Sequence, residues 1–279
     1  MMEKIKIITD STSDLSKDIV EKYNIEVLPL IVNFGEESYY DGVDMTFDKL
    51  IAKIKEGVEF PTTSQINPQR FYDCFKENIE DGYKIIYIGI GSKFSGTYQS
   101  ACIARDMLSS EDIVIIDSEN VTSGLGILVI YAGKLMEQGM NLKEIEKEIL
   151  ECIPKVDNML AFNSLEHLIK GGRLSKTAGF IGNVLSIKPM LAIRDGEIGV
   201  IDKVRGTKKA IKAVTDYLED KKVKQGTPVI LLEAPGGDMK KVVLKKLQEK
   251  DFEVIEQKVG CVVGTHSGPD AVGVFFIKD

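Results

Sequence analysis

The stretch of residues 84–108 constrains the fold of this chain more than any other part of the sequence. It begins with an apolar run, residues 85–88, that is typical of a buried β-strand. A loop rich in glycine and serine follows at residues 89–96, and a helix is expected from about Thr97. A strand that runs through such a loop into a helix is the repeating unit of a parallel sheet covered by helices.

The same loop is a candidate anion site, because the first turn of a helix carries unpaired N–H groups and a partial positive charge. Ser95 and Thr97 offer hydroxyl donors at that position. The alternative is structural, with Ser95 capping the helix and the glycines forming the turn. The loop matches neither of the two best-known nucleotide motifs. It lacks the GK[ST] ending of a P-loop, and Phe94 stands where G-x-G-x-x-G requires glycine.

The first half of the chain continues this alternation of strand and helix patterns. Short apolar runs that indicate strands occur at residues 5–9, 25–34 and 113–117. Helical spacing or capping residues indicate helices at 46–55, 67–80 and 122–137. An amphipathic helix follows at 142–153, and Pro154 ends it. We therefore expect an α/β domain with a parallel sheet over residues 1–153.

The second half has a different pattern, and we expect a second domain over residues 154–279. Asp195-Gly196 separates two apolar runs, 187–193 and 199–204, which is a strong signal for a β-hairpin. Helices are expected at 175–185, 206–220 and 238–249. A hairpin among these elements indicates a mixed or antiparallel sheet, and so an α+β domain beside the α/β domain.

Composition and charge narrow the classes of partner. The 279 residues carry a formal net charge of −7, which disfavours a nucleic-acid partner. No apolar run approaches the roughly 18 residues of a membrane-spanning helix, so we expect no stable membrane insertion. The four cysteines are isolated in sequence and there are only two histidines. We therefore expect no metal site, and we expect the protein to lie in a reducing cytoplasm.

Two further polar loops are candidates for binding. Residues 61–65 place three hydroxyls, from Thr62, Thr63 and Ser64, before an expected helix. These hydroxyls either cap that helix or donate hydrogen bonds to a carboxylate or phosphate. His266 lies in a loop of glycine and proline, where it is either structural or functional. In the functional case it hydrogen-bonds an anion, serves as a general base, or acts as a nucleophile.

Polar residues also follow the first strand, and two arginines stand at expected element ends. Residues 10–14 have the sequence DSTSD, and open α/β sheets bind ligands at the carboxyl ends of their strands. Arg173 follows a glycine pair at a helix end, and Arg205 ends a strand of the hairpin. Each arginine is either an exposed residue or a contact for a phosphate or a protein partner.

Taken together, these segments resemble the DegV family, the fatty-acid-binding proteins that include the FakB subunits of bacterial fatty acid kinase. The resemblance covers nearly the whole chain, and the joint occurrence of its motifs at this spacing is specific. The motifs are ITDSTSDL at 8–15, PTTSQ at 61–65, SGTYQSA at 95–101, DSENVTSGLG at 117–126, SLEHLIKGGRLS at 164–175, IKPML at 187–191, KVRGTKKA at 203–210 and GTHSGPDAVG at 264–273.

The resemblance implies a long-chain fatty acid held in a tunnel between the two domains or within the second. It implies a carboxylate site at Thr63 and Ser95, with His266 close by and with Thr62, Ser64 and Gly96 as neighbours. The tunnel is expected to be lined by apolar residues that serve equally well as core. They are Phe162, Leu165, Leu168, Phe180, Ile181, Leu185, Met190 and Phe275.

The resemblance also implies how such a protein is used. It has no catalytic residue and no cofactor of its own, and it acts as a carrier. A separate ATP-dependent kinase phosphorylates the bound fatty acid, and the acyl phosphate enters phospholipid synthesis. Arg173 and Arg205 match the arginines with which the family contacts this kinase.

Two alternatives remain open at this point. The resemblance also implies that the second domain is of a kind related to dihydroxyacetone kinase, so by analogy the chain could be a small-molecule enzyme with His266 as a carbonyl-binding nucleophile. It could equally carry another hydrophobic anion. One departure from the family pattern is Asp270, because the His loop often ends in GPG in the family. A carboxylate there would repel a bound carboxylate, so we expect Asp270 to face solvent or to cap the following segment.

Overall fold

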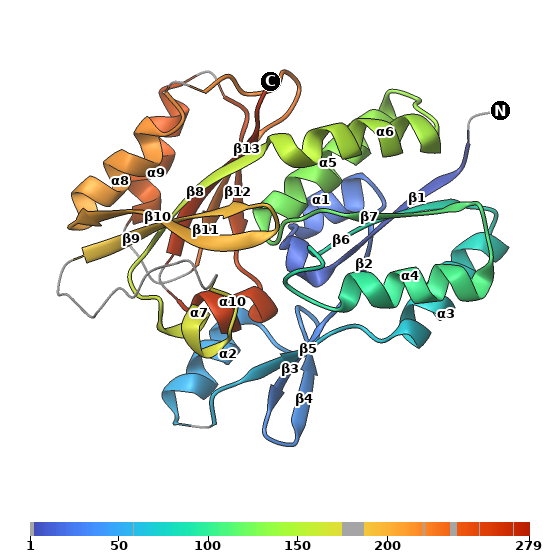
Figure 1. Cartoon of the computed structure of the whole chain (residues 1–279), viewed down its shortest axis with the longest axis horizontal. Helices are drawn as coiled ribbons and strands as arrows, with labels where there is room; N and C mark the ends of the chain where they lie inside the picture. The colour runs from blue at the N-terminus through green and yellow to red at the C-terminus, as the bar shows by residue number, and fades with distance from the viewer. Residues whose placement is uncertain are drawn as a thin grey trace.

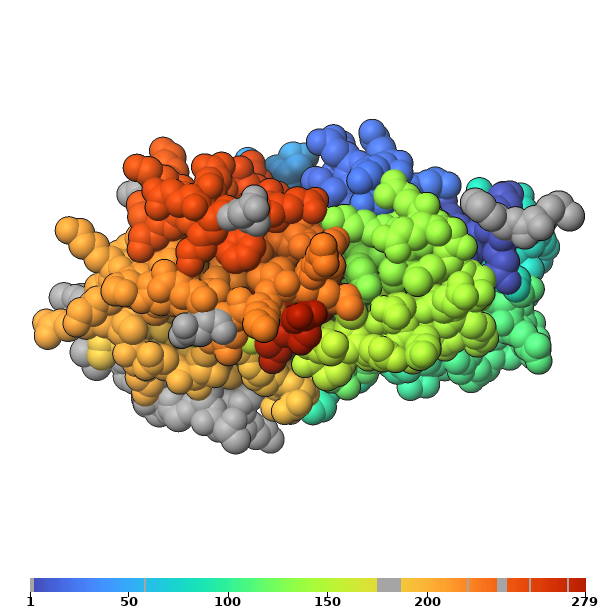
Figure 2. All heavy atoms as spheres, turned by 90° about the horizontal axis from the view of Figure 1, so that it is seen from above, coloured from blue at the N-terminus to red at the C-terminus, as the bar shows by residue number. Residues whose placement is uncertain are grey.

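The computed structural model describes residues 3–57, 59–174, 187–219, 221–234, 239–250, 252–269 and 271–279. These residues form two large sheets on opposite sides of the molecule and a small third sheet beneath both (Figure 1). The N-terminal and C-terminal halves of the chain lie side by side in close contact (Figure 2).

The first large sheet is parallel throughout and has the strand order β2-β1-β6-β7. Its strands are β1 (Ile5–Asp10), β2 (Glu26–Leu28), β6 (Lys84–Gly89) and β7 (Ile113–Asp117). Most of their side chains are buried, as in sheets that helices cover on both faces. Because the four strands run in the same direction, the loops after β1, β6 and β7 lie together at one edge of the sheet.

Helices cover both faces of this sheet. On one face lie α3 (Pro68–Glu80) and α4 (Thr97–Leu108), whose Phe71, Phe75 and Ala101 pack with Tyr87 of β6. On the other lie α5 (Ser123–Glu137) and α6 (Leu142–Cys152), and α1 (Lys17–Lys22) follows the 3₁₀ turn η1 (Ser11–Ser13). The start of α3 is set locally, because Asn67 accepts a hydrogen bond from the Arg70 N–H and proline takes the first helical position.

The small sheet is antiparallel, in the order β4-β3-β5, and the sequence did not predict it. Its strands are β3 (Ile31–Phe34), β4 (Glu37–Tyr40) and β5 (Thr62–Ser64), and α2 (Phe47–Lys55) lies between β4 and β5 in the chain. The prediction of one strand over 25–34 is wrong, because β2 and β3 belong to different sheets. Pro29 lies between them and has no N–H with which to continue a ladder.

The second large sheet has the order β10-β9-β8-β13-β11-β12. Its strands are β8 (Val156–Phe162), β9 (Ile187–Arg194), β10 (Glu197–Arg205), β11 (Val229–Glu233), β12 (Val254–Lys258) and β13 (Ala271–Ile277). The β11–β12 pair is parallel and the other described pairs are antiparallel. Asp195 and Gly196 both have positive φ in the β9–β10 turn, as an Asp-Gly hairpin requires. The predicted parallel N-terminal sheet and mixed C-terminal sheet are therefore confirmed.

Among the described residues, four helices accompany the second sheet. α8 (Thr207–Asp216) and α9 (Met239–Gln248) cover one face, while α7 (Glu166–Lys170) and α10 (Cys261–Ser267) lie at the end near the small sheet (Figure 1). The loop that was predicted around His266 is instead α10. The predicted helix over 175–185 lies outside the described residues. None of the described helices is long and apolar enough to cross a membrane.

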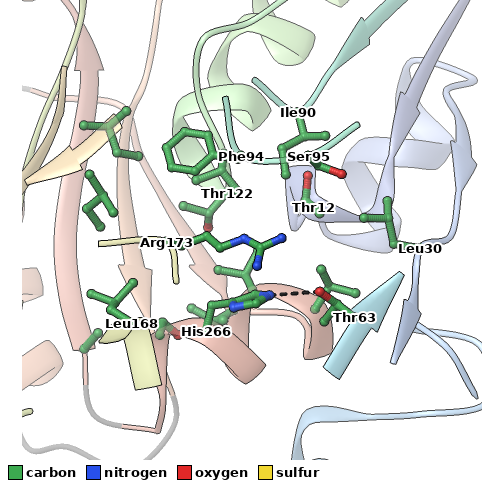
Figure 3. Close-up of a pocket in the computed structure, with 18 of the residues that line it drawn as sticks. Thr12, Leu30, Thr63, Ile90, Phe94, Ser95, Thr122, Leu168, Arg173 and His266 are labelled. Atoms are coloured by element: carbon green, nitrogen blue, oxygen red, sulfur yellow. Dashed lines mark hydrogen bonds between the residues drawn. The ribbon is translucent and has the colours of Figure 1, made fainter. Parts of the chain in front are cut away.

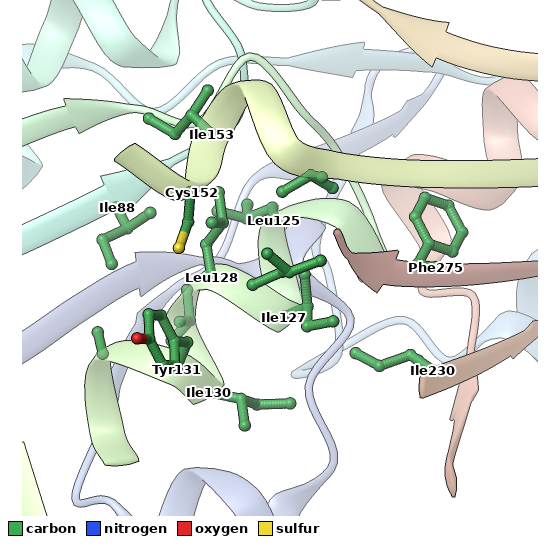
Figure 4. Close-up of a cluster of buried hydrophobic side chains, with 14 of the residues drawn as sticks. Ile88, Leu125, Ile127, Leu128, Ile130, Tyr131, Cys152, Ile153, Ile230 and Phe275 are labelled. Carbon is green, nitrogen blue, oxygen red and sulfur yellow. The ribbon is translucent and has the colours of Figure 1, made fainter. Parts of the chain in front are cut away.

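Helix α5 joins the two large sheets into one apolar core. It packs against β1 and β6 on one side and against β8, β11 and β13 on the other. Leu125, Ile127 and Leu128 share this core with Ile230 and Phe275 of the second sheet (Figure 4). The 3₁₀ turn η2 (Ile153–Lys155) leads from α6 into β8. A domain boundary at 153/154 stays a prediction, since the core runs across it.

Candidate ligand-binding site

A cavity of about 190 Å³ opens where the loops after β1, β6 and β7 meet β5, α10 and the second large sheet. Its polar lining residues come from six separate segments of the chain. Figure 3 shows the Arg173 guanidinium among Thr12, Ser95 and His266, with Phe94 and Leu168 toward the other side. The cavity therefore has a polar part next to an apolar part.

Thr63 reaches the cavity because of its position in β5. It lies opposite Val32 of β3, and side chains alternate between the two faces of a strand. Its Oγ1 lies 2.9 Å from His266 Nε2 of α10 (Figure 3). Thr62 does not line the cavity. Ser64 lines it, but the Ser64 Oγ accepts a hydrogen bond from the side chain of Asn33 at 2.9 Å.

His266 is neutral at ordinary pH. Burial, together with the positive charge of Arg173 and the neighbouring His167, lowers its pKa to about 4. Its Nδ1 is buried without a hydrogen-bond partner and lies so close to Gly171 that a Cβ there would overlap it. An unpaired ring nitrogen costs less than an orphaned N–H, so we assign the proton to Nε2. The Nε2–H then donates to Thr63 Oγ1, and the Thr63 hydroxyl hydrogen remains available to a ligand.

Ser95 stands at the start of α4 and has a hydroxyl that can donate to a ligand. Its Oγ accepts a hydrogen bond from the Thr97 N–H at 3.2 Å and lies 2.9 Å from Thr97 Oγ1. The Thr97 side chain is fully buried, so this geometry is fixed. Gly96 allows Gln65 to approach, because a Cβ at position 96 would overlap the Gln65 amide. Ser95 and Gly96 both line the cavity beside the helix start, which favours a bound anion.

Asp10 holds the loops after β1 and β6 together beneath the cavity. Its carboxylate accepts hydrogen bonds from the Ile90 N–H at 2.8 Å, the Tyr87 hydroxyl at 2.9 Å and the backbone and hydroxyl of Thr12. Burial raises the pKa of Asp10, while these donors oppose the rise. Thr12 lines the cavity, whereas Asp10 is buried behind it.

Comparison with known proteins assigns the chain to a family. The model of the DegV family matches residues 4–279. This chain belongs to the DegV family. A DegV domain-containing protein from Clostridium acetobutylicum is 55% identical over 277 residues, which are 99% of each chain. Another from Clostridium perfringens is 46% identical over 278 residues and 100% of each chain.

Solved structures of DegV proteins share the whole fold. A fatty-acid-binding DegV protein from Thermus thermophilus superposes with a TM-score of 0.90 at 28% identity, covering 99% of this chain and 100% of that one. DegV from Bacillus subtilis, a fatty acid binding protein, gives 0.88 at 29% identity and covers 100% of both chains. A stearic acid-binding protein from Eubacterium ventriosum gives 0.86 at 27% identity over 98% of both.

The apolar lining of this DegV cavity differs in part from the predicted tunnel. Phe162 and Leu168 line it, whereas Leu165 and Phe275 are buried in the core beside it. Met190 lies on the other face of the second sheet, in the cluster under α8 and α9. Phe180, Ile181, Leu185 and Asp270 lie outside the described residues. The remaining apolar lining residues are Leu30, Ile90, Phe94, Val121, Leu160, Ile193, Ile198, Leu232, Val259, Val262, Val263 and Ala271.

The two arginines occupy different places. Arg173 lines the cavity, and its guanidinium donates a hydrogen bond to the Gly171 carbonyl at 2.6 Å. Arg205 is exposed at the end of β10 and does not line the cavity. Within the described ranges, no group of three or more His, Cys, Asp or Glu side chains is placed to hold a metal ion.

Thr122 is a cavity residue that the sequence reasoning missed. It has φ +53°, which a β-branched residue rarely adopts, and it is held there by hydrogen bonds. Its N–H donates to the Thr12 carbonyl at 2.7 Å and its hydroxyl to Asp14 at 2.6 Å. Its position shortly after β7 could have indicated this role, because the loops that follow the strands of a parallel sheet lie together at one edge.

Proposed function

We propose that this protein binds a long-chain fatty acid, with the carboxylate between Thr63 and Ser95 and the acyl chain in the apolar part of the cavity. The observation that carries the proposal is the pair of hydroxyls, of Thr63 and Ser95, at the polar end of an apolar cavity. Several DegV proteins of the same fold are fatty-acid-binding proteins, which supports the choice of ligand.

The energetics fit such a ligand. Burial of a methylene contributes about 0.8 kcal/mol, so ten buried methylenes contribute about 8 kcal/mol before the cost of ordering the ligand. The apolar chain therefore supplies most of the affinity. The carboxylate needs only hydrogen-bond donors in place of the water molecules that hydrate it in solution. Neutral hydroxyls provide these donors without the burial of a further charged side chain.

We further propose that the protein is a carrier rather than an enzyme. It would present the carboxylate to a separate ATP-dependent fatty acid kinase, and the acyl phosphate would feed phospholipid synthesis. Exposed Arg205 is proposed to contact that kinase. Arg173 lines the cavity, so we propose that it affects both ligand binding and kinase contact. Replacing Arg205 with alanine should preserve fatty-acid affinity and reduce acyl phosphate formation, and an equal loss of both would contradict this division.

The alternative in which His266 is a nucleophile has less support from the geometry. Its Nε2 is hydrogen-bonded to Thr63 and its Nδ1 faces Gly171, so neither nitrogen is directed into the cavity toward a ligand. A covalent carbonyl adduct that disappears in His266→Ala would nevertheless establish that alternative.

The proposed function is tested by denaturing extraction of the purified protein followed by mass spectrometry of the extract. We expect a fatty acid to be recovered, and we expect added oleate to raise the melting temperature of delipidated protein. Recovery of a different hydrophobic anion would replace the proposed ligand. If nothing is recovered and no fatty acid raises the melting temperature, the proposed function is wrong.

A further inference from the structure

Helix α10 carries His266, yet no residue of its own segment caps its start. Gly260 holds the capping position and has no side chain. The free N–H groups are instead bound by two carboxylates from distant parts of the chain. Asp14 accepts from the Gly260 N–H at 2.9 Å, and Asp41 accepts from Cys261 at 2.8 Å and Val262 at 3.3 Å. The first N–H groups of a helix have no partner within the helix. Two distant aspartates therefore supply the cap that the local sequence lacks.

Asp41 ties α10 to the small sheet that carries Thr63. It follows β4 directly, and its own N–H donates to the Leu30 carbonyl just before β3. β3 pairs with both β4 and β5, and β5 places Thr63. Asp41 therefore connects the start of α10 to the small sheet. The Thr63–His266 hydrogen bond connects the same helix and sheet near the end of α10.

Asp14 ties α10 to the first large sheet. It ends the turn that carries Thr12, and its other carboxylate oxygen accepts the Thr122 hydroxyl at 2.6 Å. Thr12 and Thr122 both line the cavity. Through Asp41 and Asp14, the start of α10 is therefore connected to the small sheet, to the turn that carries Thr12 and to Thr122.

We propose that Asp41 and Asp14 form a clamp on α10 that sets the position of His266 against Thr63. They are positioning residues, and neither is proposed to touch the ligand. The interpretation of the Thr63–His266 pair as a ligand site rests on the proposed function, whereas the clamp itself does not.

The charges explain why both positions need a carboxylate. Burial raises the pKa of Asp41 and of Asp14, and the charge of Asp41 adds to the rise at Asp14. Among the described residues, no Lys, Arg or His forms an ion pair with either one. The N–H groups and dipole of the helix start compensate the negative charge instead. An asparagine at position 41 would keep the shape, but its NH₂ group would face the N–H of Cys261 or of Val262.

Asp41→Asn tests the clamp in the ligand-free, full-length protein. The chain has only two histidines, so long-range ¹H–¹⁵N spectra resolve His266, with His167→Gln used for assignment. We expect the midpoint of the His266 titration, which equals its pKa, to move from about 4 toward the ordinary value of 6.5, because water reaches the ring when α10 loosens. Oleate affinity should fall by about tenfold or more.

Asp157→Asn is the matched control. Asp157 is 2% exposed and Asp41 is 4% exposed, and Asp157 likewise accepts a backbone N–H, from Asn158 at 2.8 Å. It lies in the second sheet, in a network with Arg194 and Tyr217, away from α10. We expect this variant to lower the melting temperature and to leave both the His266 midpoint and the oleate affinity unchanged.

The clamp is overturned if Asp41→Asn folds with an unchanged His266 midpoint, or if Asp157→Asn shifts that midpoint equally. If Asp41→Asn does not fold, Asp14→Ala takes its place, because it removes the acceptor of the Gly260 N–H, with the same expected shift and the same contradicting result. A shifted midpoint in a protein that binds no fatty acid, before or after substitution, would support the clamp and refute the proposed function.

Discussion

At the residue scale, the account depends on two hydroxyl groups, of Thr63 and Ser95, that can donate a hydrogen bond to a carboxylate. Thr63→Val preserves the shape of the side chain and removes its donor. We expect fatty-acid affinity to fall about 5- to 150-fold, which corresponds to about 1–3 kcal/mol for a hydrogen bond to a charged group. A competition assay with a fluorescent fatty acid measures this change.

Thr62→Val is the matched control for that substitution, because Thr62 is the preceding residue of the same strand and does not line the cavity. Its affinity should equal that of the unsubstituted protein. Equal losses in the two variants would show that strand β5, and not the Thr63 hydroxyl, is responsible.

His266 gives a prediction with a definite pH dependence. Its pKa is lowered from 6.5 to about 4, so between these values the unfolded chain binds a proton that the folded protein does not. The stability contributed by neutral His266 is therefore complete above about pH 6.5 and is lost as the pH falls toward about 4. The free energy of unfolding, from urea denaturation, should exceed that of His266→Gln by a margin that shrinks across this range. A margin independent of pH would contradict the lowered pKa.

The sequence indicated several residues that the structure brings together. Thr63, Ser95 and His266 stand in hydroxyl- or glycine-rich motifs, and the structure places all three at one cavity. Which neighbours face the cavity could not be predicted, because that depends on the pairing register of β5. Thr62 was therefore grouped with Thr63 and Ser64, although it does not line the cavity.

At the element scale, α10 is held by close packing as well as by the clamp. A Cβ at Gly264 would overlap the Phe47 ring of α2, so Gly264→Ala should push α10 away from α2. We expect a loss of about 1–3 kcal/mol in stability, typical of overpacking, and weaker fatty-acid binding as His266 leaves Thr63. Chemical denaturation and the competition assay measure the two effects.

Phe47→Leu provides the internal control for this prediction. Leucine removes the edge of the ring, so the double variant should recover part of the stability and the affinity that Gly264→Ala loses. Strictly additive effects would mean that the Gly264–Phe47 contact does not set the place of α10.

Local sequence failed at the element scale where distant residues decide the structure. The segment Cys261–Ser267 contains glycine and β-branched residues, which are weak helix formers, so its pattern favoured a loop. Its caps come from Asp14 and Asp41, more than 200 positions away in the chain. Likewise, the continuous apolar run of β9 does not alternate, so nothing in it showed that Met190 faces away from the cavity.

At the scale of the whole molecule, the two large sheets share one apolar core through α5. Phe275 lies in this core beside residues of both halves (Figure 4). We therefore expect a single cooperative unfolding transition, with calorimetry and circular dichroism giving the same midpoint. Phe275→Ala should lower that midpoint, with a loss of about 3–5 kcal/mol, without splitting the transition. Two separate transitions would show that residues 1–153 and 154–279 are independent domains.

The fold class was predictable because it follows from strong local signals. Strand and helix patterns alternate in the first half, and the Asp-Gly turn defines the hairpin of the second. The small antiparallel sheet was not predictable, because its strands are short and α2 separates β5 from the other two. That sheet carries Thr63, so the arrangement of the site follows from tertiary structure.

The central claim is that a fatty-acid carboxylate lies between Thr63 and Ser95. The most direct measurement is the ¹³C NMR spectrum of oleate labelled at its carboxyl carbon and bound to delipidated protein. We predict one bound carboxyl signal at equimolar ligand, and we predict that Thr63→Val and Ser95→Ala each shift it while Thr62→Val does not. A bound signal that none of these substitutions moves, or no bound signal at all, would contradict the account.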